Sequence, residues 1–150
     1  MRYEIRPMTA ADAEAIAGWR YPGEYGFYDA DRDPADLAEL LDPAEWGTRY
    51  FAVDGEGELI GDFVLKLVGD RVEIGLGLRP DLTGRGLGLG FLRAGLRFAA
   101  ERYGTERAAL AVAAFNRRAI IVYERAGFRA VARYDHATGG GVHEFIRMEN

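Results

Sequence analysis

The sequence predicts a single α/β domain built around a mixed β-sheet. At 150 residues and 49% hydrophobic content, the chain is long enough for one domain with one sizeable core. Its apolar pattern switches between periods of two and 3.6 residues, which gives the order β-α-α-β-β-β-α-β-α-β-β. A third observation is the glycine-rich segment 83–90, which runs straight into an amphipathic helix.

The N-terminal part is expected to begin with one strand and two helices. Residues 3–6 read as a short strand, and Thr9 is expected to cap the first helix, with Asp12 completing a capping box. Pro34 opens the second helix, because proline is favoured at the first helical position. The intervening residues 21–34 are aromatic, acidic and glycine-containing, which predicts a loop.

The rest of the chain supplies most of the sheet. Period-two patterns and turn signals predict strands at 49–53, 59–68, 71–78, 108–114, 130–134 and 142–148. A long helix is expected at 86–103, and a short one follows Asn116 as its cap and ends at Gly127.

Strand 71–78 has two unlike faces. Glu73, Gly75 and Gly77 share one face, and four aliphatic residues share the other. The glycines leave the first face open, as a strand needs if a ligand lies along it, although a weak edge strand would show the same pattern.

Glycines occupy alternate positions where the long helix begins: Gly84, Gly86, Gly88 and Gly90. Glycine costs about 1 kcal/mol relative to alanine inside a helix, so this repetition needs a reason. Bare backbone and the free N–H groups of a first helical turn suit a pyrophosphate, with Arg85 beside them, whereas a flexible turn is the alternative. The spacing fits neither G-x-G-x-x-G nor a Walker loop, and the one lysine, Lys66, lies elsewhere.

Composition narrows the possible chemistry. The chain has no cysteine and no serine, which excludes disulfides, thiolate metal sites and Cys or Ser nucleophiles. The two histidines, His136 and His143, are expected at the surface, and no metal site is predicted. A net charge of −5 with scattered basic residues argues against nucleic acid or a membrane surface as partner. Without a long apolar run or a signal-peptide pattern, a cytoplasmic protein is expected.

Residues 73–128 resemble the GNAT superfamily of acyl-CoA-dependent N-acyltransferases. The segment 85–90 fits the family's R/Q-x-x-G-x-G/A signature, and 116–128 looks like its N-x-x-A-x-x-x-Y-x-x-x-G-F segment. The two motifs occur in the family's order, about 30 residues apart. The C-terminal hairpin also resembles members near the RimJ/RimL-like branch.

The resemblance implies one N-acetyltransferase domain over residues 1–150, with a mixed central sheet that splays between its fourth and fifth strands and helices on both faces. It implies that acetyl-CoA, as co-substrate, wedges into that gap. The pantetheine arm would pair with the backbone of Leu76, Gly77 and Leu78, with Asn116 on the arm and Tyr123 near the sulfur. The pyrophosphate would sit on the segment Gly84, Arg85, Gly86, Leu87, Gly88, Leu89 and Gly90.

The implied reaction transfers an acetyl group to the primary amine of a small molecule or of a protein N-terminus. An alkylamine titrates near 10.4, so a base must remove its proton, and the leaving thiolate needs a proton donor. We expect Tyr123 to be the general acid and Glu73 to be the base, directly or through water. Without Ser or Cys, direct attack in a ternary complex is favoured. A core tyrosine and a surface glutamate are the structural alternatives, and Asn116 can cap a helix while contacting the cofactor.

The motifs alone determine neither the acceptor nor whether the protein is catalytically active. The resemblance implies an acceptor site near the first helix, the following loop 21–33 and the last hairpin. The aromatic and acidic side chains of that loop suit a cationic amine. The alternative is that the aromatic side chains pack on the core and the acidic ones are solvated. The function alternative is a catalytically silent acyl-CoA-binding sensor or scaffold, and an interaction domain without CoA would make both motifs coincidental. Dimers are frequent in the family, so a homodimer is one expected assembly.

Overall fold

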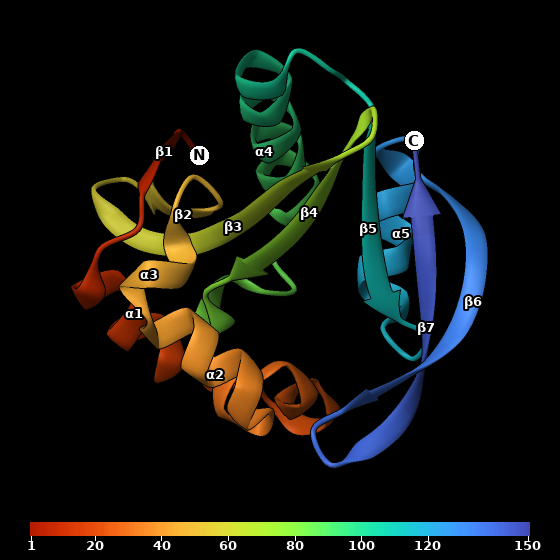
Figure 1. The fold of residues 1–150 in the computed structure, drawn as a ribbon, viewed down its shortest axis with the longest axis horizontal. Coiled ribbons are helices and arrows are strands. Elements are labelled where there is room, and N and C mark those ends of the chain that lie inside the picture. The colour runs from red at the N-terminus through yellow and green to blue at the C-terminus, as the bar shows by residue number, and fades with distance from the viewer.

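The computed structural model describes all 150 residues, and it contains one seven-stranded sheet with the order β1-β2-β3-β4-β5-β7-β6 (Figure 1). Only β4 and β5 run parallel, so the sheet is mixed, as predicted. The strands are β1 (Tyr3–Pro7), β2 (Tyr50–Gly55), β3 (Glu58–Val68), β4 (Arg71–Leu78), β5 (Ala108–Ala113), β6 (Arg129–Thr138) and β7 (Gly141–Glu149).

Five α-helices and three short 3₁₀ helices surround the sheet. The α-helices are α1 (Ala10–Ala17), α2 (Pro34–Leu41), α3 (Pro43–Trp46), α4 (Gly88–Tyr103) and α5 (Arg117–Arg125). The 3₁₀ helices are η1 (Gly23–Tyr28), η2 (Ala30–Arg32) and η3 (Pro80–Leu82). No helix combines the length and the apolar character needed to cross a membrane.

Helix boundaries follow the predicted caps with one exception. The Thr9–Asp12 capping box is present at α1, and the Asn116 side chain accepts a hydrogen bond from the Ala119 amide at the start of α5. Helix α4 begins at Gly88 rather than at residue 86. Gly84 and Gly86 have φ angles of 73° and 77°, which keep them in a turn ahead of the helix.

The N-terminal connection is more ordered than predicted. Residues 21–34 contain η1 and η2 instead of an irregular loop. Helix α3 was not predicted, although Asp42 caps it and Pro43 opens it, the same two signals that mark α2. Its four residues are too few to show a helical repeat of apolar positions.

Hydrophobic residues on the two faces of the sheet form separate clusters. The larger cluster joins the sheet to α4 and α5, and in it the rings of Phe63 and Phe91 stack with centroids 4.6 Å apart. The smaller cluster joins α1 and α2 to the opposite face, where Tyr50 and Val64 point. Helices therefore cover both faces of the sheet, as the resemblance implied.

The sheet divides between β4 and β5. These strands pair only at Val72–Ala108 and Glu73–Ala109, although β4 extends five residues further. Beyond that point β5 continues beside β7, and β4 continues beside β3 (Figure 1). The backbone of residues 74–78 thus has no strand partner on the β5 side, which is the splay implied by the resemblance.

Candidate functional site

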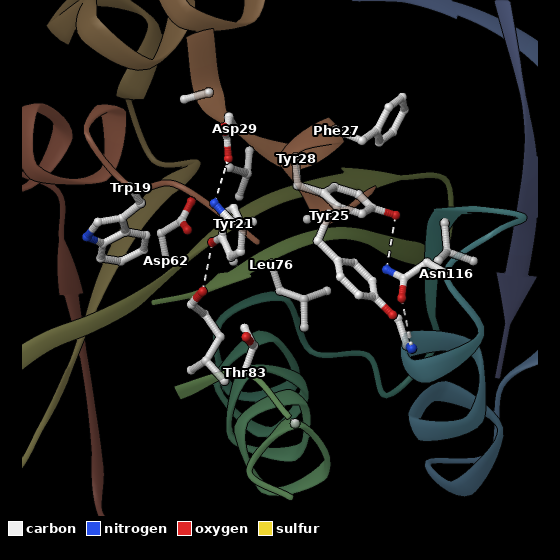
Figure 2. A pocket seen from close by; sticks show the side chains of 18 of the residues that line it. Trp19, Tyr21, Tyr25, Phe27, Tyr28, Asp29, Asp62, Leu76, Thr83 and Asn116 are labelled. Carbon is white, nitrogen blue, oxygen red and sulfur yellow. Dashed lines mark hydrogen bonds between the residues drawn. The ribbon is translucent and has the colours of Figure 1, made fainter. Parts of the chain in front are cut away.

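A cavity of about 750 Å³ occupies the region where β4 and β5 diverge. Its walls come from both halves of the chain, including α1, η1, β3, β4, β5, α5 and the glycine-rich turn before α4. Figure 2 shows these walls, with η1 above the cavity and the start of α5 beside it. The divided sheet therefore creates an interior space that the N-terminal helices help to enclose.

The glycine-rich turn forms one end of the cavity. Gly84, Gly86 and Gly88 line it, while Arg85, Leu87, Leu89 and Gly90 do not. No side chain caps the start of α4, so the N–H groups of its first turn are left free for an anion. This end can accept a pyrophosphate on backbone groups.

Arg118 is a cationic residue of this end that the sequence reading missed. Its Nη1 lies 3.3 Å from the position that a Cβ on Gly84 would take, and its guanidinium lies 4.2 Å from the Tyr25 ring centroid. It stands two residues after Asn116 in the second motif, where the family pattern leaves the residue type open. Its position gives the glycine turn a positive charge that Arg85, outside the lining, does not provide there.

The open edge of β4 forms a long side of the cavity. Leu76, Gly77 and Leu78, the residues that the resemblance implies for the pantetheine arm, all line it. The Leu78 carbonyl accepts a hydrogen bond of 2.7 Å from the Tyr21 hydroxyl, so one group of this edge already has a protein partner (Figure 2).

Tyr123 and Asn116 approach the cavity from α5. Burial, together with the nearby Tyr28, raises the pKa of Tyr123, so its hydroxyl group stays protonated at neutral pH. Asn116 has two roles: its Oδ1 caps α5, and its Nδ2 donates a 3.0 Å hydrogen bond to the Tyr28 hydroxyl. The Asn116 amide therefore links η1 to α5 across the cavity (Figure 2).

Glu73 lies at the closed end of the splay and does not line the cavity. Its Oε2 accepts a 2.8 Å hydrogen bond from Nη1 of Arg147, which reaches from β7 across β5. The residues of β5 that Arg147 crosses, Ala109 and Ala111, are small enough to allow this contact. The structure therefore does not bring Glu73 together with Tyr123 in one cavity.

The aromatic and acidic residues 21–33, which follow α1, cover one side of the cavity. Phe27 and Tyr28 pack on Phe115, and Phe27 also contacts Phe145 of β7, so these rings pack on one another rather than in the core, and Tyr28 stays 37% exposed. Two acids of this segment accept hydrogen bonds from backbone amides, while Asp31 forms an ion pair with Arg20. Asp29 accepts a hydrogen bond from the Tyr21 amide, and Asp33 caps α2.

Asp62 is a second residue that the sequence reading missed. It lies on β3 directly opposite Gly77 and lines the cavity, and its carboxylate forms no hydrogen bond or ion pair with the protein. Burial raises its pKa to about 7. The sequence did contain a signal for this site, because an aspartate interrupts the apolar run 59–68 and the next strand has a glycine-rich face for it to share.

Comparison with known proteins agrees with this geometry. The family model for the acetyltransferase (GNAT) domain matches residues 2–129. Mycothiol acetyltransferase from Clavibacter sepedonicus is 37% identical over 125 residues, which cover 83% of this chain and 39% of that protein. The Streptomyces coelicolor mycothiol acetyltransferase is 36% identical over 123 residues, covering 79% and 37%. The chain thus spans about two fifths of the length of these curated relatives.

Solved structures share the fold at low sequence identity. A GNAT-family acetyltransferase from Bacillus anthracis superposes with a TM-score of 0.75 at 20% identity, covering 100% of this chain and 95% of that one. Spermidine N-acetyltransferase from Vibrio cholerae, in complex with CoA and spermine, gives 0.77 at 19% identity, covering 99% and 94%. The Escherichia coli ribosomal-protein-S18-alanine N-acetyltransferase gives 0.68 at 22%, covering 99% and 92%. On its sequence motifs, its divided sheet and its match to the family model, the chain belongs to the GNAT acetyltransferase family.

Proposed function

We propose that this protein transfers an acetyl group from acetyl-CoA to a primary amine by direct attack in a ternary complex. The observation that carries the proposal is the cavity between β4 and β5, which combines an anion-binding glycine turn, an open strand edge and a protonated tyrosine. A silent acyl-CoA-binding module would need only the first two of these features.

The residues present fit acetyl-CoA as co-substrate. Gly84, Gly86 and Gly88, with Arg118 beside them, would hold the pyrophosphate on the turn and on the first amides of α4. The open backbone at Leu76, which faces the gap on the β5 side, would align the arm along β4. When bound, acetyl-CoA supplies an activated thioester carbon.

Tyr123 is proposed as the acid that protonates the leaving thiolate. Its raised pKa means that the hydroxyl proton is present at neutral pH, which a general acid requires, although burial also makes this phenol a weaker acid than a free tyrosine. The backbone N–H of Leu78, which faces away from β3, would stabilise the carbonyl oxygen during attack.

Two carboxylates compete for the role of base. Glu73 is the candidate from the sequence, but its carboxylate is held by Arg147 outside the cavity and would need a water chain to reach the amine. Asp62 lies inside the cavity and has no protein partner.

The acceptor is proposed to be a cationic amine, either a small molecule or a protein N-terminus. Asp36 and Asp62 line the cavity together with the rings of Trp19 and Tyr21, a combination that favours cations. Relatives and neighbours named for mycothiol, spermidine and the alanine of ribosomal protein S18 support an amine acceptor without selecting among these classes.

The test is release of free CoA from acetyl-CoA in the presence of a panel of primary amines, comparing the natural protein with Tyr123→Phe. We expect at least one amine to be acetylated, with a loss of kcat of about 10²-fold in the variant. Tight acetyl-CoA binding without acetylation of any amine in the panel would instead support the silent module.

A further inference from the structure

We propose that Asp62 binds the ammonium group of the acceptor and takes its proton, a role that rests on the transferase function proposed above. Under this proposal the base is Asp62 on β3, inside the cavity, and not Glu73, which pairs with Arg147 where β4 and β5 are still joined.

The position of Asp62 carries the proposal. Asp62 and Gly77 are register partners, so their side-chain positions point to the same face of the sheet. A Cβ on Gly77 would lie 2.5 Å from Oδ1 of Asp62, which places the carboxyl group directly over the Gly77 backbone. That backbone is where the thioester arm would align, so an amine held by Asp62 would stand beside the acetyl group.

The surroundings of Asp62 suit an ammonium ion. In Figure 2 its carboxyl group lies between Trp19 and Tyr21, whose rings can contact a cation through their faces. No arginine, lysine or hydrogen-bond donor of the protein satisfies this carboxylate, unlike Asp29, Asp31 and Asp33, which all have protein partners. A substrate cation would supply the missing partner.

The titratable groups around Asp62 are few. Tyr50 approaches it from β2 and Tyr21 from the segment after α1, and the charge of Asp62 contributes to the raised pKa of both phenols, which burial chiefly causes. Strand β4 presents only glycine to it, and Asp29 and Asp36 also line the cavity. Burial raises the pKa of Asp62 to about 7. An alkylammonium has a pKa near 10.4 and an ordinary aspartate one near 3.9, so the buried Asp62 is a better match as a base for the ammonium than an ordinary aspartate would be.

The ammonium nitrogen gives one proton to Asp62, and its lone pair then forms the C–N bond with the thioester carbon. When the C–S bond breaks, the thiolate takes the Tyr123 hydroxyl proton, and the second amine proton restores the tyrosine through water. The proton on Asp62 returns to solvent at the cavity mouth, so that one ammonium and one acetyl thioester give one amide, one thiol and one free proton.

The first test compares Asp62→Asn with Asp70→Asn, which removes the same charge from an exposed turn residue. With any amine that the natural protein acetylates, we expect kcat/KM to fall about 10²- to 10⁴-fold in Asp62→Asn and to stay within about threefold in Asp70→Asn. The rise of kcat/KM with pH through about 7 should disappear in Asp62→Asn, while its acetyl-CoA Kd stays close to that of the natural protein. Activity retained in Asp62→Asn but lost in Glu73→Gln would overturn the assignment.

The second test needs no turnover and uses the natural protein. Carbon-13 NMR of labelled aspartate carboxyls would follow the titration of Asp62, assigned by its absence in Asp62→Asn, with CoA bound, which has no acetyl group to transfer. Excess ethylammonium chloride should lower the pKa of Asp62, whereas equal sodium chloride should not. An unchanged Asp62 titration would refute the ammonium site even if acetyl-CoA binds, whereas an ammonium effect without turnover in the amine panel would refute only the transferase function.

Discussion

The stability of Asp62→Asn relative to that of the natural protein should increase as the pH rises. The pKa of Asp62 is about 7 in the folded protein, against about 3.9 in an unfolded chain. Between these values the folded state binds more protons than the unfolded state, so ionisation of Asp62 lowers stability as the pH increases. The substitution removes that dependence, because an asparagine amide does not titrate.

The magnitude follows from the two pKa values. From about pH 5 to about pH 8, folded Asp62 binds more protons than unfolded Asp62, and the difference integrates to about two pH units. The free energy of unfolding of the natural protein should therefore fall by about 2–3 kcal/mol relative to that of Asp62→Asn over this range. Urea unfolding of the natural protein and of Asp62→Asn at both pH values gives this difference directly, and Asp70→Asn serves as the control because its side chain is 72% exposed. The reasoning is refuted if the stability difference between Asp62→Asn and the natural protein is the same at both pH values.

Two further substitutions test the packing of the site. Gly77→Ala should destabilise the protein by about 1 kcal/mol, since its Cβ would lie 2.5 Å from Asp62 Oδ1 and force that carboxyl group into another rotamer. Gly75→Ala should not, since its nearest contact would be Val64 Cβ at 3.6 Å, and equal losses in urea unfolding would contradict this. Arg147→Met should cost no more than about 1 kcal/mol, because its ion pairs with Glu73 and Glu149 are partly exposed, and a loss that persists in about 1 M salt would show another role.

Much of the fold could be predicted because its signals are local. The Thr9 capping box, the alternation along 71–78 and the Asn116 cap each lie within a few residues, and the structure has all three. The predicted start of the long helix lies two residues before Gly88, since amphipathic spacing does not reveal the positive φ of Gly84 and Gly86.

The candidate site was less predictable because its residues meet only through long-range pairing. Asp62 becomes part of the cavity through its register with Gly77, and the sequence alone does not give that register. Glu73 shares a strand face with Gly77, yet the sequence did not show that Arg147 would reach it across β5. The roles of Tyr123, Glu73 and the cofactor-binding residues stay predictions.

Acetyl-CoA binding by calorimetry tests the central claim most directly, using the natural protein, Gly88→Ala and Gly88→Glu. A Cβ on Gly88 would lie 3.5 Å from the Val122 methyl groups, an ordinary contact, so the alanine variant should fold and bind. We expect micromolar binding, about −8 kcal/mol, in the first two proteins and none in Gly88→Glu, whose carboxylate would repel the pyrophosphate. Absence of binding to the natural protein, or undiminished binding to Gly88→Glu, would contradict the assignment of the glycine turn as the cofactor site.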